Sequence, residues 1–348
     1  MKRILTILLS FIIIFSFVSN SFAAEKHSMH FFDTFDTIIT IIGYSDSKEI
    51  FDTETQKAQD MFRMYHKYFD IYNEYEGVVN MCTLNKTAKD GPVKVDKELF
   101  DFLVYGKKLQ LELPTGVNMA MGSVLKEWHD YRTAGINNPA EAKLPSMDSL
   151  IELNNYTDIN NLELDEEAQT VYYKDPNMLL DTSAVSKGYA TEMVADYLAG
   201  SSMPSFVISA GGNVKAGISP LDGREFWSIG IQDPKTAQSE SNKMLNVVGI
   251  KEMAVVTSGD YQRYYIVDGK KYHHIIDSVS LMPADHVKAV TILTENSAMA
   301  DYLSTALFIM PYEEGFEFVK GLDGVDALWV LLDDTVKMTE GFEKVVID

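Results

Sequence analysis

This 348-residue sequence contains an aspartate and a threonine four residues apart, Asp301 and Thr305. Their side-chain types and their spacing suggest that they could bind a metal ion. On a helix, residues at this spacing lie on one face, so a carboxylate and a hydroxyl would point the same way. Oxygen ligands of this kind suit Mg²⁺, which binds one or two protein carboxylates and completes its shell with water and phosphate oxygens. Taken alone, the pair is common, and an ordinary helix face is the simpler interpretation.

A second candidate is the segment DTSAVSKGYA, residues 181–190, which leads from an apolar stretch into a predicted helix. The backbone N–H groups at the start of a helix, together with the ammonium of Lys187, can hold an anion such as phosphate. A well-capped helix with a surface lysine is the alternative. The residues alone leave both interpretations open.

Two adjacent histidines, His273 and His274, lie in a stretch whose β-branched residues predict a strand over 273–276. Successive strand side chains point to opposite faces, so only one of the two would face a site. A histidine can act as a general base near neutral pH, although a lone strand histidine is more often packed or exposed. The sequence has no HExxH motif and a single cysteine, Cys82, which argues against a zinc site.

The elements that must position these residues follow from the hydrophobic pattern. Helical spacing predicts helices over 54–73, 95–112, 186–199 and 297–310. Strands are predicted over 31–44, 170–173, 205–209, 227–232, 253–257, 263–267, 273–276 and 287–293. The stretch 139–161 is rich in Pro, Asn and Asp and predicts a loop-rich insertion or hinge. Strands that form hairpins and outnumber the helices favour an α+β fold with a mixed β-sheet and packed helices.

The N-terminal residues 1–23 carry two basic residues, an apolar run of about 15 residues and a small-residue stretch, which together predict a secretory signal peptide. We therefore expect an exported, extracytoplasmic protein in which 24–348 forms a single domain, either as one body or as two closely joined lobes. The formal net charge of −21 argues against nucleic acid as a partner.

Six segments, taken in order, closely resemble the FAD:protein FMN transferases of the ApbE family. They span nearly the whole chain after the N-terminal stretch, and six in this order are not expected by chance. The segments are FDTIITI at 35–41, DTSAVSKGYA at 181–190, SAGGNVKAG at 209–217, VVTSGDYQRYY at 255–265, YHHIID at 272–277 and VTILTENSAMADYLSTALF at 290–308.

The resemblance implies a T-fold-like flavin transferase architecture and a site in which Mg²⁺ sits on the pyrophosphate of FAD. The ion would be held by the carboxylate of Asp301, the hydroxyl of Thr305 and the backbone carbonyl of Ala184. The catalytic residues implied are His274, as the base, and Lys187. The residues implied to contact FAD are Phe35, Gly116, Val117, Asn118, Asp181, Lys187 and Ile275.

The implied reaction is the transfer of FMN from FAD to a threonine or serine hydroxyl of a target protein, with release of AMP. By analogy with the family, the target is an extracytoplasmic domain of a membrane redox complex. The same residues would also serve an Mg²⁺-dependent FAD pyrophosphatase that yields FMN and AMP. An exported flavin-binding protein without catalysis is a third possibility.

Two departures from the family pattern bear on the site. The loop after the histidine pair reads DSVSLMP over 277–283, where many relatives have Asp-Pro-x-Thr-Gly-x-Pro. Asn118 stands where the family has an acidic residue, so a hydrogen bond can be kept there but not the charge.

Overall fold

A computed structural model describes residues 24–237, 243–261 and 263–347. The predicted signal peptide, residues 1–23, lies outside the described residues. Within the described ranges, none of the helices combines the length and apolar character needed to cross a bilayer.

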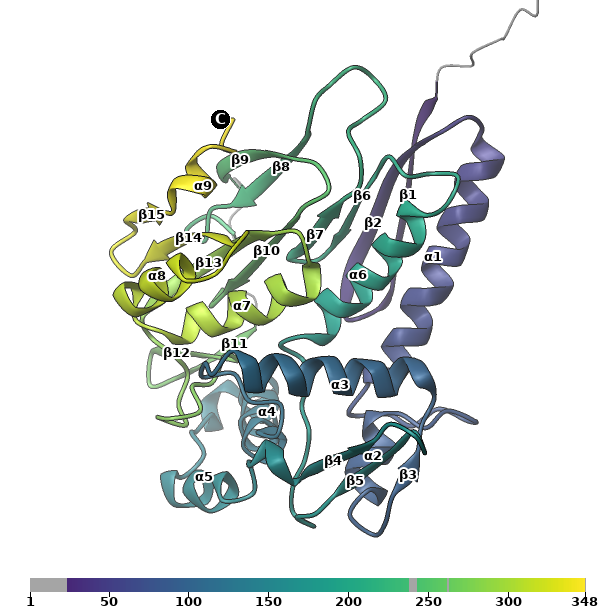
Figure 1. Ribbon diagram of the computed structural model, residues 1–348. Coiled ribbons are helices and arrows are strands. Elements are labelled where there is room, and N and C mark those ends of the chain that lie inside the picture. The colour runs from purple at the N-terminus through teal and green to yellow at the C-terminus, as the bar shows by residue number, and fades with distance from the viewer. Residues whose placement is uncertain (1–23, 238–242, 262, 348) are drawn as a thin grey trace, which may run out of the picture.

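An eight-stranded sheet forms the centre of the fold, with the order β1-β2-β6-β7-β10-β13-β14-β15 (Figure 1). Each neighbouring pair in this sheet is antiparallel. The strands are β1 (Glu25–Thr34), β2 (Thr37–Ser45), β6 (Phe206–Ala210), β7 (Asn213–Ala216), β10 (Ala254–Gly259), β13 (Val287–Thr294), β14 (Asp326–Leu331) and β15 (Val336–Met338).

The sheet is covered on both faces, as the alternation along β10 shows. Ala254 and Val256 belong to the core beneath the helices, whereas Val255 between them belongs to the core on the opposite face. Helices α1 (Lys48–Phe69), α6 (Ser186–Ala199) and α7 (Ser297–Ile309) lie over the first face (Figure 1). The hairpin of β8 (Trp227–Gln232) and β9 (Met244–Ile250) supplies side chains to the second core.

The remaining elements lie in three places. Most lie below helix α3 in Figure 1, one hairpin lies beside the left end of that helix, and two helices lie near β14. A third core joins α4 to the β11–β12 hairpin through buried residues that include Trp128 and Tyr265. These elements are α2 (Met81–Thr87), α3 (Lys97–Glu112), α4 (Gly122–Asn137), α5 (Met147–Asn154), α8 (Tyr312–Lys320), α9 (Glu340–Glu343), the short helices η1 (Pro139–Glu141) and η2 (Ile159–Asn161), β3 (Val93–Lys94), β4 (Leu162–Asp165), β5 (Thr170–Tyr173), β11 (Tyr264–Val267) and β12 (Lys270–His273).

The α+β class with packed helices is confirmed, with one refinement. The strand ladders of the described residues are antiparallel throughout, and the parallel pairing expected of a mixed sheet is reduced to one isolated bridge, Met121 to Leu179. Hairpin connections explain the pairs β1–β2, β6–β7 and β14–β15, because strands that follow one another closely along the chain pair antiparallel. The other neighbours in the central sheet are joined by longer connections.

Several predicted boundaries were wrong. The single strand expected over 31–44 is a hairpin, β1–β2, whose turn residues Phe35 and Asp36 have φ of 55° and 49°. Glycine commonly marks a turn of this kind, but both turn residues here are non-glycine residues in the left-handed region. The turn was therefore not predicted. Helix α1 begins at Lys48 because Ser47 caps it, its side chain accepting from the N–H of Ile50 at 3.3 Å.

Two further predictions differ from the structure. The stretch 139–161, expected to be loop-rich, contains helix α5. The strand expected over 273–276 ends at His273, so His274 lies just beyond β12.

Candidate active site

The closest packing at the site lies between α6 and α7, where Gly188 meets Asp301. The backbone N–H of Gly188 donates to Oδ2 of Asp301 at 2.7 Å. A Cβ atom at position 188 would overlap both Cβ of Asp301 and the carbonyl oxygen of Ser297. Glycine is therefore required here by close approach, and it fixes the buried carboxylate against the first turn of α6.

The carboxylate of Asp301 is buried beside few compensating groups. Burial raises its pKa, whereas the nearby charge of Lys187 and the hydrogen bond from Gly188 act in the opposite direction. The carboxamide of Asn213 also lowers this pKa, although neither of its polar atoms reaches hydrogen-bonding geometry with a described residue. A buried acid next to an unsatisfied amide is unfavourable unless a further polar or cationic partner is present.

These residues fit a cation that is held by one carboxylate. In the part of the chain that the structure describes, no three His, Cys, Asp or Glu side chains gather to hold a metal ion. Mg²⁺ is compatible with such a site, because it often binds one carboxylate and takes its other ligands from phosphates and water. Thr305 and Ala184, the other two expected ligands, are partly exposed, whereas Ser304 and Val185 beside them are buried.

The expected flavin-contacting loop, Gly116 to Asn118, packs against the end of α7. A Cβ atom on Gly116 would lie 2.7 Å from Cγ2 of Ile309. The side chain of Asn118 is engaged within the protein: Oδ1 accepts from Gln110 and from the N–H of Ala120, both at 2.9 Å, and Nδ2 donates to the carbonyl of Thr157 at 2.8 Å. Asn118 thus shapes the loop, and Val117 beside it is buried.

Two other expected FAD-contacting residues lie against neighbouring elements. Phe35 packs on α1, with ring centroids 5.5 Å from His66 and 6.4 Å from Phe62. Ile275 is buried, and its N–H donates to Nδ1 of His273 at 3.2 Å. Asp181 is partly exposed at the turn before α6, where its charge acts on neighbouring aromatic and basic side chains.

The two adjacent histidines differ in role. His273 is buried, lies 2.7 Å through Nε2 from the carbonyl of Ala284 and packs edge-on against Phe308. His274 is partly exposed, and its Nδ1 lies 3.2 Å from the carbonyl oxygen of Arg263. Because a carbonyl only accepts, Nδ1 carries the proton in this hydrogen bond, which leaves Nε2 with a free lone pair.

The pKa of His274 determines its charge state. Burial, followed by the positive charges of Arg263 and Arg132, lowers its pKa to about 3. The imidazole is therefore neutral at physiological pH with Nε2 unprotonated, and so low a pKa makes it a weaker base than an ordinary histidine.

Sequence reasoning missed four residues around His274. The rings of Tyr72 and His129 pack at a tilt of 34° with centroids 4.8 Å apart, and Nη2 of Arg132 lies 3.0 Å from Nδ1 of His129. Arg263, just before β11, is the fourth. Trp128, Arg132 and Gly135 recur at helical spacing and could have revealed α4, but no local pattern links that helix to His274.

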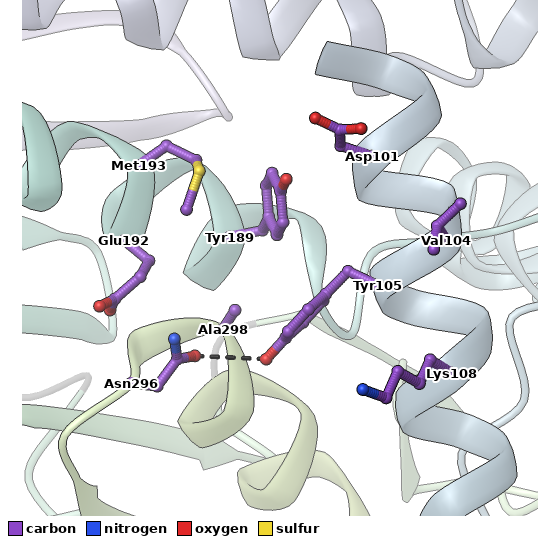
Figure 2. Close-up of a pocket in the computed structure, with 9 residues that line it drawn as sticks. All are labelled: Asp101, Val104, Tyr105, Lys108, Tyr189, Glu192, Met193, Asn296 and Ala298. Atoms are coloured by element: carbon purple, nitrogen blue, oxygen red, sulfur yellow. Dashed lines mark hydrogen bonds between the residues drawn. The ribbon is translucent and has the colours of Figure 1, made fainter. Parts of the chain in front are cut away.

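A separate pocket of about 380 Å³ lies between α3, α6 and the start of α7 (Figure 2). None of the expected site residues lines it. Its polar side chains hold the N-terminus of α7: Glu192 accepts from the N–H of Ser297 at 2.5 Å, and Tyr105 donates to Asn296 at 3.3 Å. The pocket wall thereby supports the helix that carries Asp301, and we assign it no ligand.

The fold and the site together describe an α+β protein in which a buried carboxylate, Asp301, lies against a helix start and a neutral histidine, His274, is partly exposed. Solved structures share this fold. The apbe protein of Thermotoga maritima superposes with a TM-score of 0.80 at 24% identity and covers 93% of this chain and 100% of that chain. The apo form of the flavinyl transferase ApbE of Pseudomonas stutzeri has a TM-score of 0.76 at 21% identity, covering 94% and 98%. At these identities the likeness establishes the fold alone.

Sequence comparison establishes the family. The ApbE family model matches residues 35–329. A FAD:protein FMN transferase of Treponema pallidum is 31% identical over 304 residues, which cover 82% of this chain and 81% of the relative. A FAD:protein FMN transferase of Klebsiella pneumoniae is 28% identical over 274 residues, covering 78% and 81%. The chain belongs to the ApbE family, and the expected resemblance is confirmed.

Proposed function

We propose that this chain is an Mg²⁺-dependent FAD:protein FMN transferase, which moves FMN from FAD to a threonine or serine hydroxyl of a target protein and releases AMP. The observation that carries the proposal is the contact between Gly188 and Asp301. It places a buried carboxylate beside Lys187 and the N-terminus of α6, where a cation and a pyrophosphate can be held together. The names of the curated relatives support the same activity.

The chain's own residues divide the work of this reaction. The ammonium of Lys187, together with the positive end of the α6 dipole, binds and orients the pyrophosphate. Mg²⁺, held by Asp301, Thr305 and the carbonyl of Ala184, would neutralise charge on the phosphoryl oxygens.

His274 serves the incoming hydroxyl. Its Nε2 takes the hydroxyl proton while the hydroxyl oxygen bonds to the phosphorus of the FMN half. The bond from that phosphorus to the bridging oxygen breaks, and AMP leaves with the oxygen. General-base assistance of this kind contributes about 10²- to 10⁴-fold.

Hydrolysis of FAD to FMN and AMP is a second candidate, because His274 is partly exposed and water can reach it. The reaction is therefore a transfer when an acceptor hydroxyl attacks the phosphorus and a hydrolysis when water does so. We place the target outside the cytoplasm, in a domain of a membrane redox complex, in keeping with the predicted signal peptide.

Mass spectrometry of a threonine-bearing acceptor after incubation with FAD and Mg²⁺ tests the proposal. Transfer adds the mass of one FMN to the threonine. Free FMN and AMP without a labelled acceptor would establish hydrolysis instead. FAD that stays bound and intact for hours would establish a flavin-binding protein without catalysis.

A further inference from the structure

Two fully buried asparagines in the described ranges, Asn80 and Asn213, differ in their hydrogen bonds. Nδ2 of Asn80 donates to the carbonyls of Lys67 and Asn73 at 3.0 and 2.7 Å, and Oδ1 accepts from the N–H of Thr83 at 3.0 Å. Neither polar atom of Asn213 has a hydrogen-bond partner among the described residues. A buried amide without a partner is costly, so we expect Asn213 to be satisfied by something other than the polypeptide.

The pairing of β7 determines the direction in which the side chain of Asn213 points. Asn213 lies directly opposite Ala210 on β6 and Val256 on β10. Residues that lie directly opposite each other in an antiparallel pair have their side chains on the same face of the sheet. Ala210 and Val256 both belong to the core beneath the helices. Asn213 therefore points from the sheet toward the helices that carry Gly188 and Asp301.

Lys215, two residues further along β7, points in the same direction. Its Nζ lies 3.2 Å from Oε1 of Glu192 on α6, and alternate residues of a strand share one face. Helix α7 packs across β7 and β10, so Asp301 on that helix lies above Asn213. The two side chains are close enough to interact, because burial raises the pKa of Asp301 and the carboxamide of Asn213 acts against this rise.

The backbone around Asn213 is fixed by the glycine turn that precedes it. Gly211 has a φ of 63° and connects β6 to β7 in a tight turn. A Cβ atom on Gly212 would lie 2.7 Å from the carbonyl oxygen of Thr257 on β10, and the N–H of Thr257 donates to the carbonyl of Gly212 at 2.9 Å. The backbone therefore holds Asn213 in place without any hydrogen bond from its side chain, which leaves the carboxamide available for a ligand.

A carboxamide can serve two neighbours at once, because its nitrogen donates and its oxygen accepts. The carboxylate of Asp301 only accepts, and its Oδ2 already takes the N–H of Gly188 at 2.7 Å. Nδ2 is therefore the atom of Asn213 that can stabilise this carboxylate, and Oδ1 is left to accept from another donor. Mg²⁺ that is bound through one carboxylate keeps several water molecules, and such water molecules are donors.

Building on the proposed function, in which Asp301 binds Mg²⁺, we infer that Asn213 is the positioning residue of the metal site. Its Nδ2 orients the carboxylate of Asp301, and its Oδ1 accepts from a water molecule of the bound ion. Groups that hydrogen-bond to metal ligands in this way strengthen metal binding without touching the ion. Asn213 thereby connects the central sheet to the metal site and adds no charge to it.

The test compares Asn213→Leu and Asn213→Ala with wild type. Leucine removes both polar groups of the amide and keeps the number of side-chain atoms, whereas alanine removes them without any risk of overpacking. Asn80→Leu is the matched control, because Asn80 is equally buried but has its hydrogen bonds within the protein. Calorimetry measures Mg²⁺ binding to the metal-free protein, alone and with ADP, which carries a pyrophosphate but no flavin. Thermal unfolding in EDTA measures the stability of each variant.

We expect both Asn213 variants to bind Mg²⁺ about 10- to 100-fold more weakly than wild type. The Mg²⁺ concentration that gives half-maximal FAD turnover should rise with this loss, while kcat at saturating Mg²⁺ changes little. Asn80→Leu should show the reverse pattern, with wild-type affinity for Mg²⁺ and a lower unfolding temperature. The unfolding temperature of Asn213→Leu in EDTA should fall less than that of Asn80→Leu, because the amide of Asn213 has no partner to lose.

Two results would overturn the inference. Mg²⁺ affinity that stays at the wild-type level in both Asn213 variants would show that Asn213 does not support the metal site. An equal loss of affinity in Asn80→Leu would show that the loss follows from general destabilisation. If wild type binds no Mg²⁺, or binds it no better than Asp301→Asn does, the proposed metal site itself fails, which is a separate outcome.

Discussion

The two halves of the site are built differently. Under the proposed function, one half of the site is the metal half. It consists of Ala184 just before α6, Lys187 and Gly188 in the first turn of α6, and Asp301 and Thr305 on α7. Its parts come from two packed helices, and its carboxylate is buried against a glycine that tolerates no side chain. Such a half is suited to one small substrate held in one geometry.

The histidine half consists of His274, Arg132 and Arg263, with His129 and Tyr72 behind them. His129 and Arg132 come from α4, Arg263 from the chain before β11, His274 from the bend after β12 and Tyr72 from the chain after α1. One hydrogen bond joins His274 to the carbonyl of Arg263, and two join His129 to Arg132 and Tyr72, at a partly exposed surface. The difference fits the proposed function, in which the metal half would hold FAD in one geometry and the histidine half would receive a polypeptide.

Asp301→Asn is expected to have the largest effect. Asparagine keeps an acceptor for the N–H of Gly188 but removes the charge that a cation requires. Mg²⁺-dependent FAD turnover should fall about a thousandfold, equivalent to about 4 kcal/mol. Turnover is measured against Mg²⁺ concentration, and the unfolding temperature of the metal-free protein should not fall, because an uncompensated buried charge is removed. Turnover at the wild-type rate in the variant would show that Asp301 does not bind the metal ion.

His274→Gln should lower acceptor labelling by about 10²- to 10⁴-fold. The affinity for FAD, measured by flavin fluorescence, should stay unchanged, because the metal half is intact. In wild type, kcat/KM for labelling should show no fall near pH 6.5, since the pKa of His274 is lowered to about 3. A clear loss of rate near pH 6.5 that disappears in His274→Gln would contradict this charge state.

The same pKa predicts the effect of pH on stability. The unfolded chain binds a proton at this histidine near pH 6.5, whereas the folded chain does so only near pH 3. The contribution of His274 is therefore fully present above pH 6.5 and is lost as the pH falls toward 3. Urea unfolding across this window should show a smaller loss for His274→Gln than for wild type, and equal losses would be inconsistent with the lowered pKa.

Gly188→Ala tests how rigid the metal half is. The added methyl group would overlap Asp301 and the backbone of Ser297. The free energy of unfolding should fall by about 1–3 kcal/mol, as overpacking usually costs, and FAD turnover should fall with it. Gly200→Ala is the matched control at the other end of α6, where a Cβ atom would lie 3.7 Å from the carbonyl of Asp196. Equal stability of the two variants would show that the helices can move apart.

The sequence predicted the metal half better than the histidine half for a physical reason. The helices over 186–199 and 297–310 were predicted from local periodicity, as was the shared face of Asp301 and Thr305. The structure places the ends of both helices within one residue of the predicted ends. His274 and Arg132 are distant in sequence, and only the packing of α4 against β11 brings them together.

The hairpin turn at Phe35 and Asp36 was missed for a related reason. Its β-branched neighbours continue the strand pattern, while positive φ at two non-glycine residues leaves no mark in the composition. Asn118 is a different case. The sequence shows that it replaces the acidic residue of the family pattern, but only the structure shows its three hydrogen bonds within the protein.

Tyr72→Phe is expected to have the smallest effect. It removes the hydroxyl next to His129 and loosens Arg132 without changing any charge. The KM for a threonine-bearing acceptor should rise by about two- to fivefold, with kcat unchanged, as for one hydrogen bond. Steady-state labelling kinetics measure the change, with Tyr131→Phe, on the helix that carries His129, as the control. A fall in kcat with no change in KM would argue that Tyr72 acts on the chemistry directly.

The division of labour between the halves is tested most directly by measuring FAD binding and acceptor labelling in parallel, with Mg²⁺ present, for wild type, Asp301→Asn and His274→Gln. We predict that Asp301→Asn loses Mg²⁺-dependent FAD binding and labelling together, whereas His274→Gln binds FAD as wild type does and loses labelling. Undiminished labelling in His274→Gln, or equal loss of FAD binding in both variants, would contradict the account.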